Sequence, residues 1–108
     1  MKKTVGILSE LKTLFEDSRI KCSFVFGSFA SNEEVAKSDL DLVIIGNIGL
    51  RETSKLLANY QSVLGREINP HVFKESEWKK RVKEKDHFVM SILKSNIEVI
   101  KGDIENYR

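Results

Sequence analysis

The sequence has little of several residue types that often narrow a function. Its 108 residues include one cysteine, one proline and one tryptophan. A single cysteine, Cys22, cannot form a disulfide within the chain. Without a Cys-x-x-Cys pair or a Cys/His cluster the sequence also offers no zinc site. The fold should therefore need neither an oxidising compartment nor a structural zinc ion.

Long apolar runs are missing as well. Segment 4–15 is interrupted by Ser9, Glu10, Lys12 and Thr13, so it lacks the continuous apolar stretch of a signal peptide. No other segment approaches the roughly 20 apolar residues of a membrane-spanning helix. We therefore expect a cytoplasmic, soluble protein with no membrane partner.

Neither sign of charge is in large excess. Eighteen Lys and Arg residues against sixteen Asp and Glu give a net charge of +2. A dedicated nucleic-acid-binding domain usually carries a much larger basic excess, so we expect no direct DNA binding. Hydrophobic residues make up 41% of the chain. This content is enough for a core, and 108 residues are too few for a second one, so residues 1–108 should form a single domain.

Hydrophobic periodicity predicts an alternation of helices and strands. Apolar residues three and four positions apart indicate amphipathic helices, and short runs of β-branched and aromatic residues indicate strands. The expected helices cover 5–15, 50–64 and 76–93, the last broken near Asp86, and the expected strands cover 20–26, 40–45, 67–73 and 97–100. Pro70 lacks a backbone donor, so strand 67–73 should lie at a sheet edge or be irregular. The fold class is therefore α/β or α+β, with a small mixed sheet and helices packed on one face.

The segment with chemical information joins Gly27 and Ser28 to Asp39 and Asp41. Asp39 and Asp41 lie two residues apart on an expected strand. Both carboxylates therefore point to the same face, with Cα atoms about 6.6 Å apart. Paired carboxylates suit Mg²⁺, which commonly bridges to substrate phosphates, and a Gly-Ser turn brings backbone and hydroxyl donors to a phosphate. The pattern predicts phosphoryl or nucleotidyl transfer on a nucleotide.

Each half of this pattern also has an ordinary structural explanation. A Gly-Ser turn is common, and acids at the start of a strand are often solvated or cap a nearby helix. The two halves with their spacing of ten residues would occur together by chance in roughly one in a thousand chains of this composition. We therefore treat them as one site.

The pattern of Gly27-Ser28, ten residues, then Asp39 and Asp41 resembles the signature of the minimal nucleotidyltransferases in the DNA polymerase β-like superfamily. The order of helices and strands fits that superfamily, and residues 64–73 resemble a subgroup often seen with an N-terminal winged helix. The resemblance implies Mg²⁺-dependent transfer of a nucleoside monophosphate, AMP from ATP, to an acceptor hydroxyl. Gly27 and Ser28 would hold the nucleotide, and Asp39 and Asp41 would bind the metal. It also implies a HEPN-type toxin as the acceptor, with this chain as its antitoxin.

The superfamily usually has a third acid on the strand after the second helix. Here that strand offers Glu67 and Asn69, which share a face. Only Glu67 can carry negative charge or remove a proton, so it is the candidate third catalytic acid. If Asn69 occupies that position, the chain is instead a catalytically degenerate module that neutralises a partner by binding. A nucleotide sensor related to winged-helix regulators is a third hypothesis.

The remaining histidines and aromatic residues receive a structural interpretation. His71 and His87 lie sixteen residues apart, and neither sits beside a nucleophile. Helical spacing relates Trp78, Val82, Phe88 and Val89, which indicates a core face of helix 76–93 rather than a base-stacking platform. Self-association through a sheet edge remains open for so small a domain.

Overall fold

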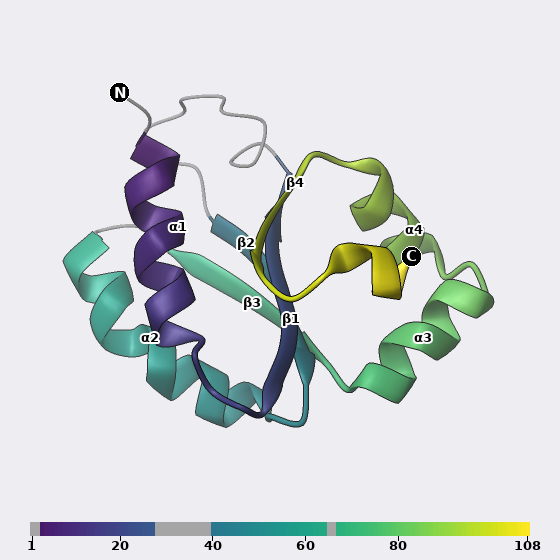
Figure 1. The fold of residues 1–108 in the computed structure, drawn as a ribbon, viewed down its shortest axis with the longest axis horizontal. Coiled ribbons are helices and arrows are strands. Elements are labelled where there is room, and N and C mark those ends of the chain that lie inside the picture. Colours follow the sequence, from purple (N-terminus) through teal and green to yellow (C-terminus); the bar gives the residue numbers. More distant parts are fainter. Residues whose placement is uncertain (1–2, 28–39, 65–66) are drawn as a thin grey trace.

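The computed structural model describes residues 3–27, 40–64 and 67–108 (Figure 1). The elements in chain order are α1 (Lys3–Leu14), β1 (Ile20–Phe26), β2 (Leu40–Gly46), α2 (Leu50–Leu64), β3 (Ile68–Phe73), α3 (Glu75–Lys83), α4 (His87–Lys94), β4 (Ile97–Lys101) and the 3₁₀ helix η1 (Ile104–Tyr107). Each helix and strand expected from the sequence is present, with bounds that differ by at most two residues. Only η1 was not expected.

The described strands form one mixed sheet in the order β3-β2-β1-β4. Strand β1 is antiparallel to both β2 and β4, whereas β2 and β3 are parallel and are connected through α2. Pro70 lies in β3, which forms one edge of the sheet. The edge position predicted from this proline is confirmed, because an edge strand has one side on which no ladder donor is needed.

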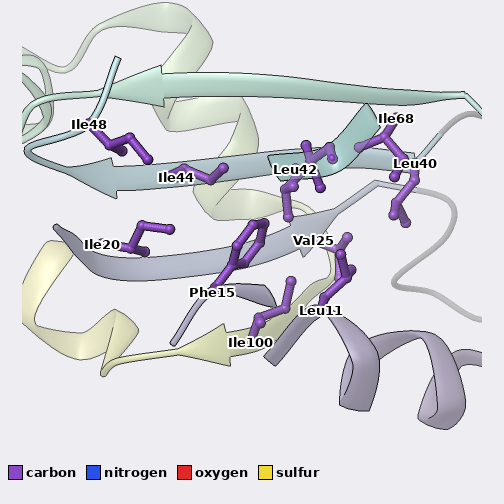
Figure 2. Packing of buried hydrophobic residues seen from close by; sticks show 11 residues of the cluster. Leu11, Phe15, Ile20, Val25, Leu40, Leu42, Ile44, Ile48, Ile68 and Ile100 are labelled. Carbon is purple, nitrogen blue, oxygen red and sulfur yellow. The ribbon is translucent and has the colours of Figure 1, made fainter. Parts of the chain in front are cut away.

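The two faces of the sheet are covered by different helices (Figure 1). Figure 2 shows the cluster beneath α1 and α2, which contains Leu11, Phe15, Ile20, Val25, Leu40, Leu42, Ile44, Ile48, Leu57, Ile68 and Ile100. The cluster on the second face, beneath α3, α4 and η1, contains Cys22, Phe24, Val43, Ile45, Phe73, Trp78, Val89, Ile92, Ile104 and Tyr107.

The predicted α+β class and mixed sheet are confirmed, but the helices are not confined to one face. The reason lies in the two central strands, β1 and β2, whose apolar residues run almost continuously instead of alternating with polar ones. Such strands have two faces to remove from water. Helices α3 and α4 therefore cover the second face. Burial also raises the pKa of the Cys22 thiol to about 11, and Cys22 packs as a small core residue.

Two local features end α3 and begin α4 near Asp86, as predicted. Lys85 adopts a positive φ of 55°, a conformation that cannot continue a helix. The Asp86 side chain then accepts a hydrogen bond of 3.1 Å from the amide of Val89 and so caps α4. After the break, α4 contributes Val89 and Ile92 to the core on the second face.

The C-terminal segment is fastened to the second face by Trp78 and Tyr107. The indole Nε1 of Trp78 donates a hydrogen bond of 2.7 Å to the carbonyl of Tyr107, and the Tyr107 hydroxyl donates one of 2.6 Å to Glu75. Burial and the Glu75 carboxylate raise the pKa of Tyr107 to about 12. Ile104 and Tyr107 of η1 thus pack in the same core as α3 and α4. Within the described ranges, no helix combines the length and apolar character needed to cross a bilayer.

Lys101 joins the last strand to the end of α1. Its ammonium donates hydrogen bonds to the carbonyls of Phe15, at 3.0 Å, and Asp17, at 2.8 Å. Phe15 directly follows α1, and a cation near a helix C-terminus interacts favourably with the helix dipole. Lys101 therefore anchors α1 to the sheet.

Replacing Lys101 with Met should lower the free energy of unfolding by about 1.5–3 kcal/mol, because it leaves the two carbonyls without their charged donor. Chemical denaturation of Lys101→Met measures this loss. Lys55→Met, an exposed position on α2, is the matched control and should stay within about 0.5 kcal/mol of the original chain. Equal stability of the two variants would contradict the anchoring role.

Asp17 should make the stability of the chain depend on pH in the acid range. Hydrogen bonds from Arg19 lower the pKa of Asp17 from 3.8 to about 2. A carboxylate with a lowered pKa in the folded state stabilises the fold above its unfolded pKa, and this contribution disappears as the pH falls through the folded value. The stability difference between the original chain and Asp17→Asn should therefore be largest above pH 4 and vanish towards pH 2. Urea denaturation across this range tests the prediction, which a constant difference would contradict.

Candidate functional site

Gly27 and Asp41 lie side by side where β1 ends and β2 begins. Phe26, the last residue of β1, is paired with Asp41 in the antiparallel register. Gly27 follows with φ of 86°, and a Cβ added to it would lie 3.8 Å from Oδ2 of Asp41. Its amide donates a hydrogen bond of 3.2 Å to the carbonyl of Asn96. Glycine is favoured here by its positive φ, since the space around the Cβ position is ordinary.

Strand β2 determines where the Asp41 carboxylate emerges. The side chains on either side of it, Leu40 and Leu42, are fully buried beneath α1 and α2. Side chains alternate between the faces of a strand, so Asp41 points to the second face, where its side chain is 41% exposed. The backbone of β2 is paired with β1 on one side and β3 on the other. Asp41 is therefore held on one of the two central strands of the sheet.

The strand register decides which residue of β3 lies beside Asp41. In the parallel pairing Asp41 is opposite Asn69, and Leu40 is opposite Ile68. Glu67 comes before the first paired residue of β3, its side chain is exposed, and its carbonyl accepts a hydrogen bond of 2.9 Å from the amide of Leu40. The amide side chain of Asn69, and not the Glu67 carboxylate, therefore lies next to Asp41.

His71 also lies beside Asp41, a contact that the sequence analysis did not predict. Its Nε2 atom is 4.0 Å from Oδ1 of Asp41, and the His71 side chain is 34% exposed. Residues 69 and 71 share a face of β3, so both point to the side of the sheet from which Asp41 emerges. The sequence did carry a signal for this: His71 is two residues after Asn69 on an expected strand, so the two side chains share a face.

Two aromatic rings lie close to the His71 ring. The Phe26 ring is 5.7 Å from it, centroid to centroid, and the Phe88 ring is 5.4 Å from it. Phe88 is 42% exposed, so its assignment to a core face of the last helix was wrong. Trp78 and Val89 do belong to the core as predicted. Phe88 directly precedes Val89, and one residue turns a helix by about 100°, which points Phe88 away from the core.

Two further predicted site residues, Ser28 and Asp39, lie outside the described residues. Residues 3–27, 40–64 and 67–108 contain no group of three or more His, Cys, Asp or Glu side chains arranged to hold a metal ion. They do bring together the Asp41 carboxylate and the Asn69 amide, both of which carry oxygen donors. Oxygen is the donor that Mg²⁺ prefers, so this pair fits part of a magnesium site.

Comparison with protein families identifies the domain. The model of the family described as polymerase beta, nucleotidyltransferase, matches residues 9–105. The chain belongs to this family. The match spans the sheet and the helices on both faces, and it includes the Gly-Ser and Asp-x-Asp positions. A comparison with curated protein sequences returned no match.

Solved structures with the same fold come from toxin-antitoxin complexes. A structure of a toxin-antitoxin with AMP-PNP has a TM-score of 0.60 and 12% identity, over 92% of this chain and 76% of that chain. A mutant of the MntA-HpeT toxin-antitoxin has a TM-score of 0.59 and 9% identity, over 98% and 77%. A tri-AMPylated Shewanella oneidensis HEPN toxin in complex with an MNT antitoxin has a TM-score of 0.56 and 11% identity, over 98% and 76%. At these identities the likeness establishes the fold.

An aspartate in place of Asn69 tests whether this position belongs to a cation site. Like charges directly opposite each other on neighbouring strands destabilise a sheet by up to about 1 kcal/mol. We expect Asn69→Asp to unfold at a lower temperature than the original chain without Mg²⁺ and to regain stability as Mg²⁺ is added. Thermal denaturation with and without Mg²⁺ measures both effects.

The matched control is Asn47→Asp, an exposed position just after the far end of β2. Its thermal stability should not respond to Mg²⁺ beyond the response of the original chain. An Asn69→Asp variant that likewise gains nothing from Mg²⁺ would show that residue 69 does not face a cation.

Proposed function

We propose that the chain is a Mg²⁺-dependent nucleotidyltransferase that transfers AMP from ATP to an acceptor hydroxyl. The observation that carries this proposal is the placement of Gly27 against the Asp41 carboxylate, where the two halves of the Gly-Ser and Asp-x-Asp pattern meet. A carboxylate beside a glycine with positive φ puts a metal ligand next to backbone that a phosphate can approach closely. Membership of the nucleotidyltransferase family supports the same reaction class.

Each residue of the site has a proposed role. Gly27 and Ser28 hold the triphosphate, and Asp39 and Asp41 hold Mg²⁺, which when bound neutralises phosphate charge. The acceptor oxygen bonds to the α-phosphorus, the bond from that phosphorus to the oxygen bridging to the β-phosphate breaks, and pyrophosphate leaves. Glu67 is the proposed acceptor of the hydroxyl proton, since the Asn69 amide beside Asp41 cannot take one.

The proposed acceptor lies on a HEPN-type partner protein, with this chain acting as the antitoxin. Support comes from the solved structures that share the fold, one of which is an AMPylated HEPN toxin in complex with an MNT antitoxin and another a toxin-antitoxin with AMP-PNP.

Asn69 favours a second candidate function. Its position opposite Asp41 leaves an amide where a third carboxylate would strengthen both metal binding and proton removal. A domain with that site weakened could still recognise the partner through its surface. In this alternative the chain neutralises a toxin by stoichiometric binding, without transferring AMP.

Transfer of label from α-labelled ATP to the HEPN-type partner tests the first function. The original chain with Mg²⁺ should label the partner, and Asp41→Asn should reduce the initial rate by about 100-fold or more, because it removes a preorganised charge from the reacting centre. Glu98→Gln, which removes an exposed carboxylate from β4 at the far edge of the sheet, is the matched control and should label the partner normally.

The binding alternative makes the opposite prediction. If a variant with both Asp39→Ala and Asp41→Ala still neutralises the partner fully while no label is transferred by any form of the chain, neutralisation rests on contact. Loss of neutralisation together with loss of label would instead support catalysis.

A further inference from the structure

Phe88 is an apolar side chain exposed beside the candidate site. In the described residues it is one of two large hydrophobic side chains with high exposure, at 42%, and the other is Leu50, at 57%. Leu50 begins α2, after the far end of β2. Phe88 instead sits on α4 with its ring against His71, the histidine whose Nε2 atom lies 4.0 Å from the Asp41 carboxylate.

Three neighbouring rings make up what we call the aromatic platform: Phe26, His71 and Phe88. The His71 ring is tilted by 51° to that of Phe26 and by 59° to that of Phe88. The Phe26 and His71 rings are half-buried, so the sheet and α4 hold them in place, while the Phe88 ring reaches furthest into solvent. Rings in this setting keep a fixed geometry at little entropic cost and still offer a face to a ligand.

The platform and Gly27 approach the same carboxylate through different oxygens. The Cβ position of Gly27 is nearest Oδ2 of Asp41, whereas Nε2 of His71 is nearest Oδ1. Gly27 directly follows β1, and His71 lies on β3, so the two approach Asp41 from the sides of its two neighbouring strands. The site therefore has a glycine side suited to phosphate, a carboxylate in the middle and an aromatic side.

A nucleotide has the same division into an anionic end and an aromatic end. We propose that the aromatic platform, and Phe88 above all, contacts the nucleobase of the nucleotide when its phosphates lie at Gly27 and Asp41. This inference rests on the proposed function and adds to it the residues that bind the base. Stacking on aromatic side chains accepts any base, because every base has a π face. The platform therefore supplies affinity for a nucleoside over bare phosphate and little choice among bases.

Calorimetric titration of ATP and of inorganic tripolyphosphate, each with Mg²⁺, tests the proposal. The original chain should bind ATP more tightly than tripolyphosphate. Phe88→Ala should weaken ATP binding by about 10-fold, within the range that loss of one stacking side chain produces, and should leave tripolyphosphate binding unchanged. Leu50→Ala removes an even more exposed apolar side chain away from the site and should alter neither affinity.

His71 provides a second pair of variants. His71→Phe keeps an aromatic ring and should retain ATP affinity, whereas His71→Ala should lose affinity for ATP and not for tripolyphosphate. This pair separates a stacking role from any role of the imidazole nitrogens. Circular dichroism of each variant confirms that the sheet and helices are intact.

The outcomes distinguish the two proposals. If the original chain binds ATP and tripolyphosphate equally, or if Phe88→Ala weakens both to the same extent or neither, the aromatic platform does not bind the base and the phosphate site stands. If the original chain binds neither ligand, the proposed function fails and the inference about the base falls with it.

Discussion

The burial of β2 on both faces is the constraint on which the rest of the structure depends. Every residue of this strand except Asp41 is buried, and its backbone is paired with β1 and β3. A strand so enclosed cannot shift by one residue without turning its charged side chain into a core and an apolar one into water. Asp41 therefore has one permitted direction, towards the second face.

The way in which helices cover that second face decides what surrounds Asp41. Helices α3 and α4 and η1 bury the part of the face that carries Phe24, Val43 and Ile45. Asp41 lies beyond the buried part of this face and keeps 41% of its side chain exposed. The same helix that closes the core, α4, also places Phe88 at the border of the site. The position of α4 on the sheet thus determines both the packing of this core and the residues that border the candidate site.

Asn69 lowers the negative charge of this site relative to one with three carboxylates. Two neighbouring carboxylates make each other harder to ionise, and together they attract a cation more strongly than one does. An amide in place of one of them has neither effect. The chain belongs to the nucleotidyltransferase family, and its fold is that of proteins found in toxin-antitoxin complexes. In the nucleotide site that we propose, fewer charges would leave more of the orienting of the reactants to uncharged contacts, and the proposed contact of the aromatic platform with the base is one of these.

Local patterns in the sequence determined the helices and strands, the break near Asp86 and the edge position of β3, because periodicity, capping and proline act over a few residues. The sequence also determined the spacing of Gly27-Ser28 to Asp39 and Asp41. It did not decide whether Glu67 or Asn69 lies beside Asp41. A period of two specifies which face of the sheet a side chain is on, but not the offset between two strands. That offset, the cover on the second face, and the meeting of His71 and Phe88 beside Asp41 were decided by tertiary packing, which depends on how all the buried side chains fit together.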